Sequence, residues 1–255
     1  MRWPFGPRVL VRRTALYQEL WLRQGFRETL QGGQRHGQPL VSRLAYTDGF
    51  HLFPPPRGGR VLFLGLGAGI GPRQMALLYG AQVTTVELHA RVVQVAGARF
   101  GAVPGIVLVE EGRGALERLP GPYDLIVVDA FGAGDHPGRL ATVEAFARCR
   151  DLLAEPGTLA VNIGGTLGGR AGRVFASLLA AFPNALAFGV SPDARFDPDV
   201  PGNTIGFGFR GAAPEPTRDR PDILPFLEAI ARGPLKPPKA DPWRDAGVPA
   251  RLPIE

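Results

Sequence analysis

From residue 60 onward, short apolar runs alternate with segments that suit helices. The apolar runs are RVLFLG (60–65), QVTTVE (82–87), GIVLVEEG (105–112), YDLIVVD (123–129) and TLAVNIGG (158–165). Helices are expected between and after them, at 72–79, 90–100, 113–119, 140–153 and 170–182. Strands that are apolar throughout and separated by helices predict a parallel sheet that helices cover on both faces. The chain is therefore expected to have an α/β fold.

Both flanks of this repeat have a different pattern. Residues 8–34 show β-type alternation around a turn at 23–25, and 39–53 show a weak helical pattern that Pro54 ends. After the last helix, ALAFGV (185–190) and NTIGFGFR (203–210) have no helix between them, which predicts an antiparallel pair. We expect an N-terminal β-hairpin module with a connecting helix over 1–54, a catalytic domain over 55–210, and a loosely packed, proline-rich tail over 211–255, with one helical segment at 223–231.

Composition argues against several classes of protein. The net charge is +6, but the basic residues are nearly all arginine and are scattered among acids, which argues against a nucleic-acid surface. Cys149 is the single cysteine, so an intrachain disulfide is excluded and a small buried thiol on a helix is expected. The first residues lack the apolar region of a secretory signal, and no apolar run is long enough to span a bilayer. These features predict a soluble, cytoplasmic protein without a nucleic-acid or membrane partner.

A glycine-rich loop, GLGAGIG, follows the first strand of the repeat directly. Backbone N–H groups and a helix N-terminus meet a ligand at such a place. The spacing fails as the dinucleotide pattern G-x-G-x-x-G, because Ile70 or Pro72 stands at the third position. Gly65, Gly67 and Gly69 instead fit G-x-G-x-G, a spacing associated with ligands of the S-adenosylmethionine type.

Acidic residues end three successive strands of the repeat. Glu87, about twenty residues after the loop, suits the two hydroxyls of a ribose, although a solvated acid at a helix start is the alternative. Glu110 and Glu111 end the third strand, where one of them can accept a hydrogen bond from an adenine amino group; an exposed pair at a helix N-terminus is the alternative. Asp129 ends the fourth strand, at the sheet edge where open α/β sheets bind ligands.

In these motifs the sequence resembles the spermidine synthase family, the aminopropyltransferases. The resemblance extends from about Tyr17 to Arg210 through the glycine loop, EEG, YDLIVVD, LATVEAF (140–146) and GTLAVNI (157–163), and it is closest to the divergent spermidine-synthase-like branch. It implies a Rossmann-like class I S-adenosylmethionine-dependent transferase fold behind a small N-terminal β-module. It also implies assembly into dimers or tetramers.

The resemblance implies a reaction as well. The family moves an aminopropyl group from decarboxylated S-adenosylmethionine to the amine of putrescine or a longer polyamine, a small-molecule partner, and uses no metal. Carried over, Glu87 matches the ribose acid, Glu111 the adenine-side acid, and Asp129 the carboxylate that takes the proton from the attacking amine. Among the histidines, His51, His89 and His136 have no metal-ligand spacing.

The chain departs from the family at the amine end of the site. Ala68 stands where the glycine loop of the family has an aspartate, and Gly132 stands where the catalytic strand has its second acid, with Asp135 as the candidate substitute. Tyr46 is the nearest match to a tyrosine before the core, and His36 is a candidate for the acceptor pocket or an ordinary turn histidine. The S-adenosyl site is thus better supported than a polyamine site. An S-adenosylmethionine-dependent methyltransferase and a non-catalytic nucleoside-binding protein are the alternatives.

Overall fold

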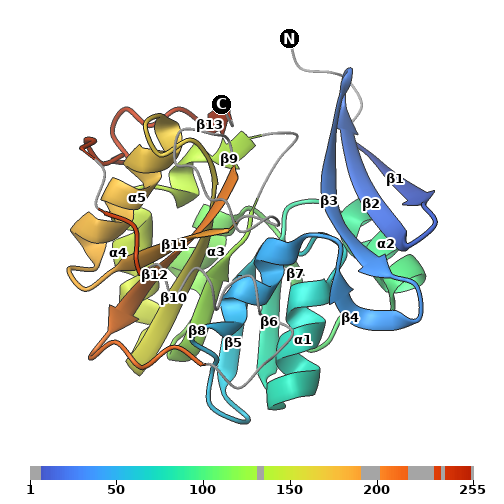
Figure 1. The fold of residues 1–255 in the computed structure, drawn as a ribbon, viewed down its shortest axis with the longest axis horizontal. Helices are drawn as coiled ribbons and strands as arrows, with labels where there is room; N and C mark the ends of the chain where they lie inside the picture. The colour runs from blue at the N-terminus through green and yellow to red at the C-terminus, as the bar shows by residue number, and fades with distance from the viewer. Residues whose placement is uncertain (1–6, 131–134, 191–201, 218–232, 237–238, 254–255) are drawn as a thin grey trace.

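The computed structural model describes residues 7–130, 135–190, 202–217, 233–236 and 239–253. Its central feature is a seven-stranded sheet with the strand order β11-β12-β10-β8-β5-β6-β7 (Figure 1). The strands are β5 (Arg60–Leu64), β6 (Gln82–Glu87), β7 (Ile106–Val109), β8 (Tyr123–Val128), β10 (Leu153–Gly165), β11 (Leu186–Val190) and β12 (Gly202–Arg210). The five neighbouring strands β10, β8, β5, β6 and β7 are parallel to one another. β12 runs antiparallel to both β10 and β11. The predicted antiparallel pair is present, with β12 inserted between β10 and the edge strand β11.

The alternation of side chains along each central strand divides the core into two layers. On β5, Leu62 and Leu64 pack with helices α3, α4 and α5, whereas Val61 and Phe63 pack with helix α1 on the opposite face. Because both sets are buried, the strand is apolar at every position from 61 to 64. The helices are α1 (Ile70–Tyr79), α2 (Ala90–Phe100), α3 (Gly112–Arg118), α4 (Val143–Leu152) and α5 (Arg170–Ala181). The predicted α/β class, with helices on both faces, is confirmed.

Two helix boundaries differ from the expected ones for local reasons. α1 begins at Ile70, two residues early, because Gly69 takes a left-handed conformation (φ 74°) as its N-cap. α4 begins at Val143 because the Thr142 side chain caps it by accepting a hydrogen bond from the Ala145 N–H. Leu140, the first residue of the expected helix, belongs instead to the separate 3-10 turn η2 (Gly138–Leu140).

The N-terminal part is a four-stranded antiparallel sheet rather than a single hairpin. Its strands are β1 (Arg8–Arg13), β2 (Tyr17–Gln24), β3 (Arg27–Arg35) and β4 (Gln38–Ser42). The helix expected over 39–53 is wrong in its first part: 39–42 belong to β4, and only η1 (Ala45–His51) is helical, as a 3-10 segment. This sheet lies beside α1 and α2 (Figure 1). Leu20 belongs to the same buried cluster as Phe100, and Leu22 to the same cluster as Ala96.

The C-terminal segment 239–253 is attached to the core, so the expectation of a loosely packed tail is wrong there. Trp243 is buried beside α5, and its backbone N–H donates to Ser177 Oγ (2.8 Å). Strand β13 (Arg251–Pro253) pairs with β9 (Asp135–Pro137), which follows the end of β8. Trp243 and the β13–β9 pairing together attach a segment that is otherwise rich in proline and charge. The helix expected at 223–231 lies outside the described residues.

Candidate functional site

A cavity of about 490 Å³ lies at the carboxyl ends of the parallel strands, between the central sheet and the N-terminal sheet. The strands β5, β6, β8 and β10 contribute residues from their ends, as expected for an open α/β sheet. The N-terminal sheet and the C-terminal segment complete the wall. Its polar and charged lining consists of Gln24, Thr29, Gln31, Tyr46, Glu87, His89, Glu110, Glu111, Asp129, Arg139, Asn162 and Asn203.

The glycine loop is shaped by backbone contacts on two sides. A Cβ at Gly65 (φ 107°) would lie 2.2 Å from the Asp129 carbonyl oxygen, and one at Gly67 (φ 53°) would lie 2.2 Å from the Gln31 carbonyl oxygen. Both glycines line the cavity, whereas Gly69 caps α1 and is absent from the lining. The loop therefore closes against β8 and β3 and presents its backbone to the cavity.

Glu87 ends β6 with its carboxylate beside the loop. Oε2 accepts a hydrogen bond from the Leu66 N–H (3.1 Å), and Oε1 accepts one from the His89 N–H (2.9 Å). Burial raises the pKa of Glu87, and these backbone donors oppose the rise. A carboxylate has about four lone-pair sites, and three backbone N–H groups, those of Leu66, Leu88 and His89, act on Glu87, so the carboxylate keeps accepting capacity for a ligand hydroxyl.

Glu110 and Glu111 line the cavity but also have structural roles. The Glu111 carboxylate caps α3, since it accepts from the Arg113 N–H (3.0 Å) and the Gly114 N–H (2.8 Å). Glu110 forms an ion pair with Arg118. These structural roles are compatible with ligand binding, because the helix cap of Glu111 and the ion pair of Glu110 each leave part of the carboxylate's accepting capacity unused.

Asp129 lies deep in the cavity within a chain of polar side chains. The Tyr46 hydroxyl donates to Oδ2 (3.3 Å) and the Asn162 side-chain amide donates to Oδ1 (2.9 Å). The Asn203 amide in turn donates to the Asn162 side-chain oxygen (2.8 Å). Burial raises the pKa of Asp129 to about 7, although both donors lower it. A carboxyl group with this pKa exchanges a proton readily near neutrality.

Other sequence candidates are not brought into the cavity. His36 is at the β3–β4 turn, where its ring contacts the Thr14 carbonyl oxygen (3.0 Å), and it is not among the residues that line this cavity. The backbone of Asp135 lies in β9, and its side chain is outside the described part. Ala68 is buried with Leu20 and Phe100 under the N-terminal sheet. The position of the missing family acid is thus occupied by apolar packing.

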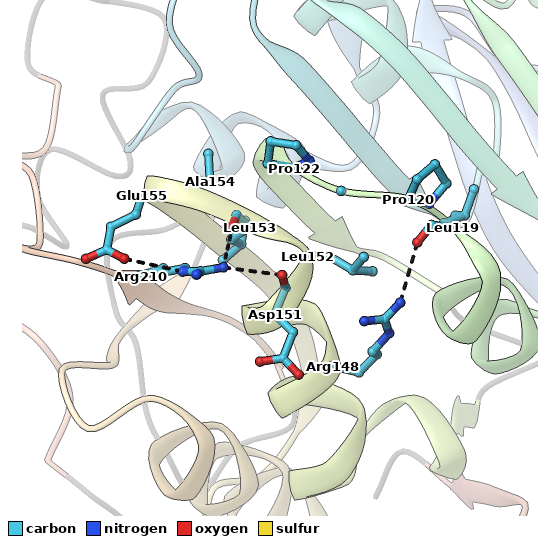
Figure 2. A pocket seen from close by; sticks show the side chains of 11 residues that line it. Leu119, Pro120, Pro122, Arg148, Asp151, Leu152, Leu153, Ala154, Glu155 and Arg210 are labelled. Atoms are coloured by element: carbon cyan, nitrogen blue, oxygen red, sulfur yellow. Dashed lines mark hydrogen bonds and ion pairs between the residues drawn. The ribbon is translucent and has the colours of Figure 1, made fainter.

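A second cavity, of about 530 Å³, lies at the opposite end of the sheet, and the arginines that line it already have protein partners (Figure 2). Its two arginines are already engaged. Arg210 donates to the Asp151 and Leu153 carbonyls (3.2 and 2.8 Å) and pairs with Glu155, and Arg148 donates to the Leu116 carbonyl (2.9 Å). These guanidinium groups satisfy carbonyls at the ends of α4 and α3. We therefore place the functional site in the first cavity.

Several cavity residues were not among the sequence candidates. Asn203 on β12, Arg139 in η2 and Gln31 on β3 come from segments far apart in the sequence. Asn203 was detectable in part, as a polar residue at the start of an otherwise apolar strand. Among the described residues, no group of three or more His, Cys, Asp or Glu side chains is arranged to hold a metal ion. No helix in the same residues has the length and apolar character needed to cross a membrane.

Two curated proteins share sequence with part of this chain, and no family model matches it. One is described as a "Probable polyamine aminopropyl transferase" of Bifidobacterium longum, 32% identical over 104 residues, or 40% of this chain. The other is an N-terminal histidine N-methyltransferase of Emericella nidulans, 30% identical over 116 residues, or 43% of this chain. The matched segments span only 23% and 21% of these two relatives.

Solved structures resemble the chain over most of its length. A "probable spermidine synthase" from Corynebacterium glutamicum superposes with a TM-score of 0.68 at 18% identity, covering 95% of this chain and 98% of that one. Human methyltransferase-like protein 13, in complex with SAH, superposes with a TM-score of 0.51 at 21% identity, covering 82% and 92%. The relatives and neighbours are transferases by name. In its fold the chain is therefore similar to spermidine synthases and to class I S-adenosylmethionine-dependent transferases, as its motifs indicated.

Proposed function

We propose that this protein is a transferase that uses decarboxylated S-adenosylmethionine to place an aminopropyl group on a polyamine or related amine. The observation that carries the proposal is the position of Asp129, a carboxyl group with a pKa of about 7 at the end of β8, facing the cavity that holds the glycine loop and Glu87. The proposal includes a cytoplasmic site of action, a small-molecule amine as partner and self-association, all of which follow from the family resemblance.

The S-adenosyl donor is a co-substrate, and the residues present suit its nucleoside part. Glu87 has accepting capacity for the ribose hydroxyls, and Glu110 or Glu111 for the adenine amino group. The cavity volume of about 490 Å³ is within the usual range for sites that bind small ligands. Gly65 and Gly67 keep the loop backbone close to this space without side chains.

Asp129 would supply the proton transfer that the reaction requires. The acceptor nitrogen attacks the aminopropyl carbon, a C–N bond forms, the C–S bond breaks, and methylthioadenosine leaves. The nitrogen must lose a proton to attack or after it has attacked, and the ionised Asp129 carboxylate takes that proton. Tyr46 and Asn162 hold the two carboxylate oxygens, so the base is oriented before the amine arrives.

One observation favours a second candidate, an S-adenosylmethionine-dependent methyltransferase. Ala68 occupies the position of the family aspartate that faces the aminopropyl group, and it is 2% exposed. A Cβ at Gly32 on β3 would lie 2.9 Å from the Ala68 Cβ, so the two backbones are in close contact. Methyl transfer needs no acid at this position. In that case Asp129 would take the proton from another nucleophile.

A product assay by mass spectrometry separates the two reactions. The protein is incubated with decarboxylated or intact S-adenosylmethionine and a panel of amines; methylthioadenosine with an extended amine is the expected result. S-adenosylhomocysteine would indicate methyl transfer instead, and donor binding without either product would favour a non-catalytic nucleoside-binding protein.

Replacement of the proposed base tests the assignment of Asp129. Asp129→Asn keeps the size of the side chain but cannot accept a proton, so we expect turnover to fall by about 10²- to 10⁴-fold while donor affinity, measured by calorimetry, changes little. Asp151→Asn makes the same change on an exposed carboxylate at the second cavity and should retain full turnover. If Asp129→Asn turns over as fast as the unsubstituted protein, Asp129 is not the base.

A further inference from the structure

The Asp129 carboxylate is connected to β12 by two side-chain amides in series. Asn162 on β10 is fully buried and uses its NH₂ group toward Asp129 and its oxygen toward Asn203. Asn162 and Asn203 lie on the paired strands β10 and β12, where Asn203 is opposite Gly164, two residues beyond Asn162. The diagonal neighbour relation in an antiparallel pair brings the two amides within hydrogen-bond distance.

The orientation of the Asn162 amide determines which protonation state of Asp129 it supports. With the NH₂ group toward Asp129, Asn162 donates to an ionised carboxylate. If the amide rotated by half a turn, its oxygen would face Asp129 Oδ1, and two acceptors at this distance repel unless the carboxyl group carries a proton. The Asn203 NH₂ group opposes that rotation, because it needs the Asn162 oxygen as its acceptor.

We propose that Asn203 is a positioning residue that keeps the Asn162 amide donating to Asp129 and so favours the ionised form of this carboxyl group. The role of Asn203 in turnover rests on the proposed function, whereas its influence on the ionisation of Asp129 can be measured without turnover. Asn203 acts through Asn162, since its recorded side-chain hydrogen bond in the described structure goes to Asn162 rather than to Asp129.

Other groups also act on Asp129 and must be kept constant in a test. Tyr46 donates to its second oxygen, and burial together with the Asp129 charge raises the pKa of Tyr46 well above its usual value. From neighbouring strands and loops, the ionisable residues that share the cavity are Glu87, His89, Glu110, Glu111 and Arg139. None of these is changed in the variants below, so a shift in titration reports on the two amides.

The test is a titration of Asp129 in the full-length protein, followed through its side-chain carboxyl carbon by NMR and assigned with Asp129→Asn. Asn203→Ala removes the donor that holds the Asn162 amide, so the midpoint should rise by about one pH unit, since the ionised form loses part of a charge-assisted hydrogen bond. Asn203→Asp places an acceptor there and should raise the midpoint further. Asn184→Ala removes an exposed amide of the same size and should leave the midpoint unchanged.

A double-mutant cycle shows whether Asn203 works through Asn162. In an Asn162→Ala background, Asn203→Ala should produce no further shift of the Asp129 midpoint. A full additional shift would overturn the proposal that Asn203 acts through Asn162. Thermal melting confirms that each variant is folded, and Asn203→Ser, which keeps a hydroxyl donor, should give an intermediate midpoint. An unchanged or lowered midpoint in folded Asn203→Ala would also overturn the proposal.

Activity then tests the catalytic meaning separately. Asn203→Ala should lower kcat at pH 7 by about fivefold, as expected from a one-unit rise of a midpoint near 7, recover most of it at pH 9, and leave the KM for the donor unchanged. If Asn203→Ala shifts the NMR midpoint of Asp129 but the unmodified protein turns over no amine, the role of Asn203 would be supported and the proposed function contradicted. If Asn203→Ala leaves the midpoint unchanged while the unmodified protein is active, only the role of Asn203 would be contradicted.

Discussion

At the scale of single residues, the protonation of Asp129 governs the expected pH dependence. Its pKa of about 7 lies above the ordinary value of an aspartic acid because the side chain is buried. A base must be ionised to act, so kcat/KM should rise about tenfold per pH unit below pH 6 and level off above pH 8. A pH–rate profile measured with a saturating donor checks this. A flat profile between pH 5 and pH 8 would exclude Asp129 as the base.

The cavity acids show how far residue types at strand ends can be interpreted. Glu87 and Asp129 were predicted from their places at the ends of β6 and β8, because parallel strands bring their carboxyl ends to one edge. The cap formed by Glu111 was weighed as the alternative, and it is present in the structure. Asn203 could not be placed, since its contact with Asn162 depends on the register of two antiparallel strands that the sequence does not specify.

At the scale of elements, a bulge in β3 brings the N-terminal sheet onto the glycine loop. The pairing of β2 with β3 shifts register between Leu20 and Trp21, and Gln31 is the extra residue. Its carbonyl lies against Gly67, while the next residue, Gly32, packs on Ala68. The N-terminal sheet therefore forms part of the surroundings of the glycine loop.

Substitution of Gly32 tests this contact. A Cβ at Gly32 would lie 2.9 Å from both the Cβ and the backbone nitrogen of Ala68, so Gly32→Ala should lower the free energy of unfolding by about 1–3 kcal/mol. Gly97→Ala is the matched control: Gly97 is exposed within α2 with open space around it, and the change should stabilise by about 0.5–1 kcal/mol. Urea unfolding measures both, and equal effects of the two changes would contradict the packing described.

The elements were predictable where burial alone decides them. β5, β6 and β8 are apolar runs covered on both faces, and their predicted bounds agree with the structure to about a residue. β4 was misread as helical because Leu40, Val41 and Leu44 have a spacing that suits a helix, yet pairing with β3 satisfies the backbone of 38–42 as a strand. A short segment of mixed polarity takes its structure from its neighbours.

At the scale of the whole molecule, arginine connects separate parts of the fold. Arg73 donates to the Gly101 carbonyl after α2, Arg150 to the Ala181 carbonyl at the end of α5, and Arg210 to carbonyls at the end of α4. These contacts give three of the arginines a structural role. Each guanidinium group offers several donors in a fixed plane, and a lysine would not satisfy as many carbonyls.

The C-terminal segment makes a measurable contribution to the whole fold. Trp243 is 9% exposed, its carbonyl accepts from the Val143 N–H at the start of α4, and the Arg173 guanidinium lies 3.4 Å from its ring centroid. Trp243→Ala should cost about 3–5 kcal/mol of stability. Phe26→Ala, at a side chain that is 99% exposed, should change stability by less than about 0.5 kcal/mol. Comparable midpoints of thermal unfolding for the two variants would show that the segment is dispensable.

The cavity has one consequence for the chain as a whole. Pro7, at the first described position, and Ala250, near the last, both line it, together with the ends of the central strands. A molecule that fills the space therefore contacts both extremities of the described chain at once. By reciprocal linkage, a ligand that binds more tightly when both extremities are attached strengthens their attachment, and detachment of either one weakens its binding by the same free energy.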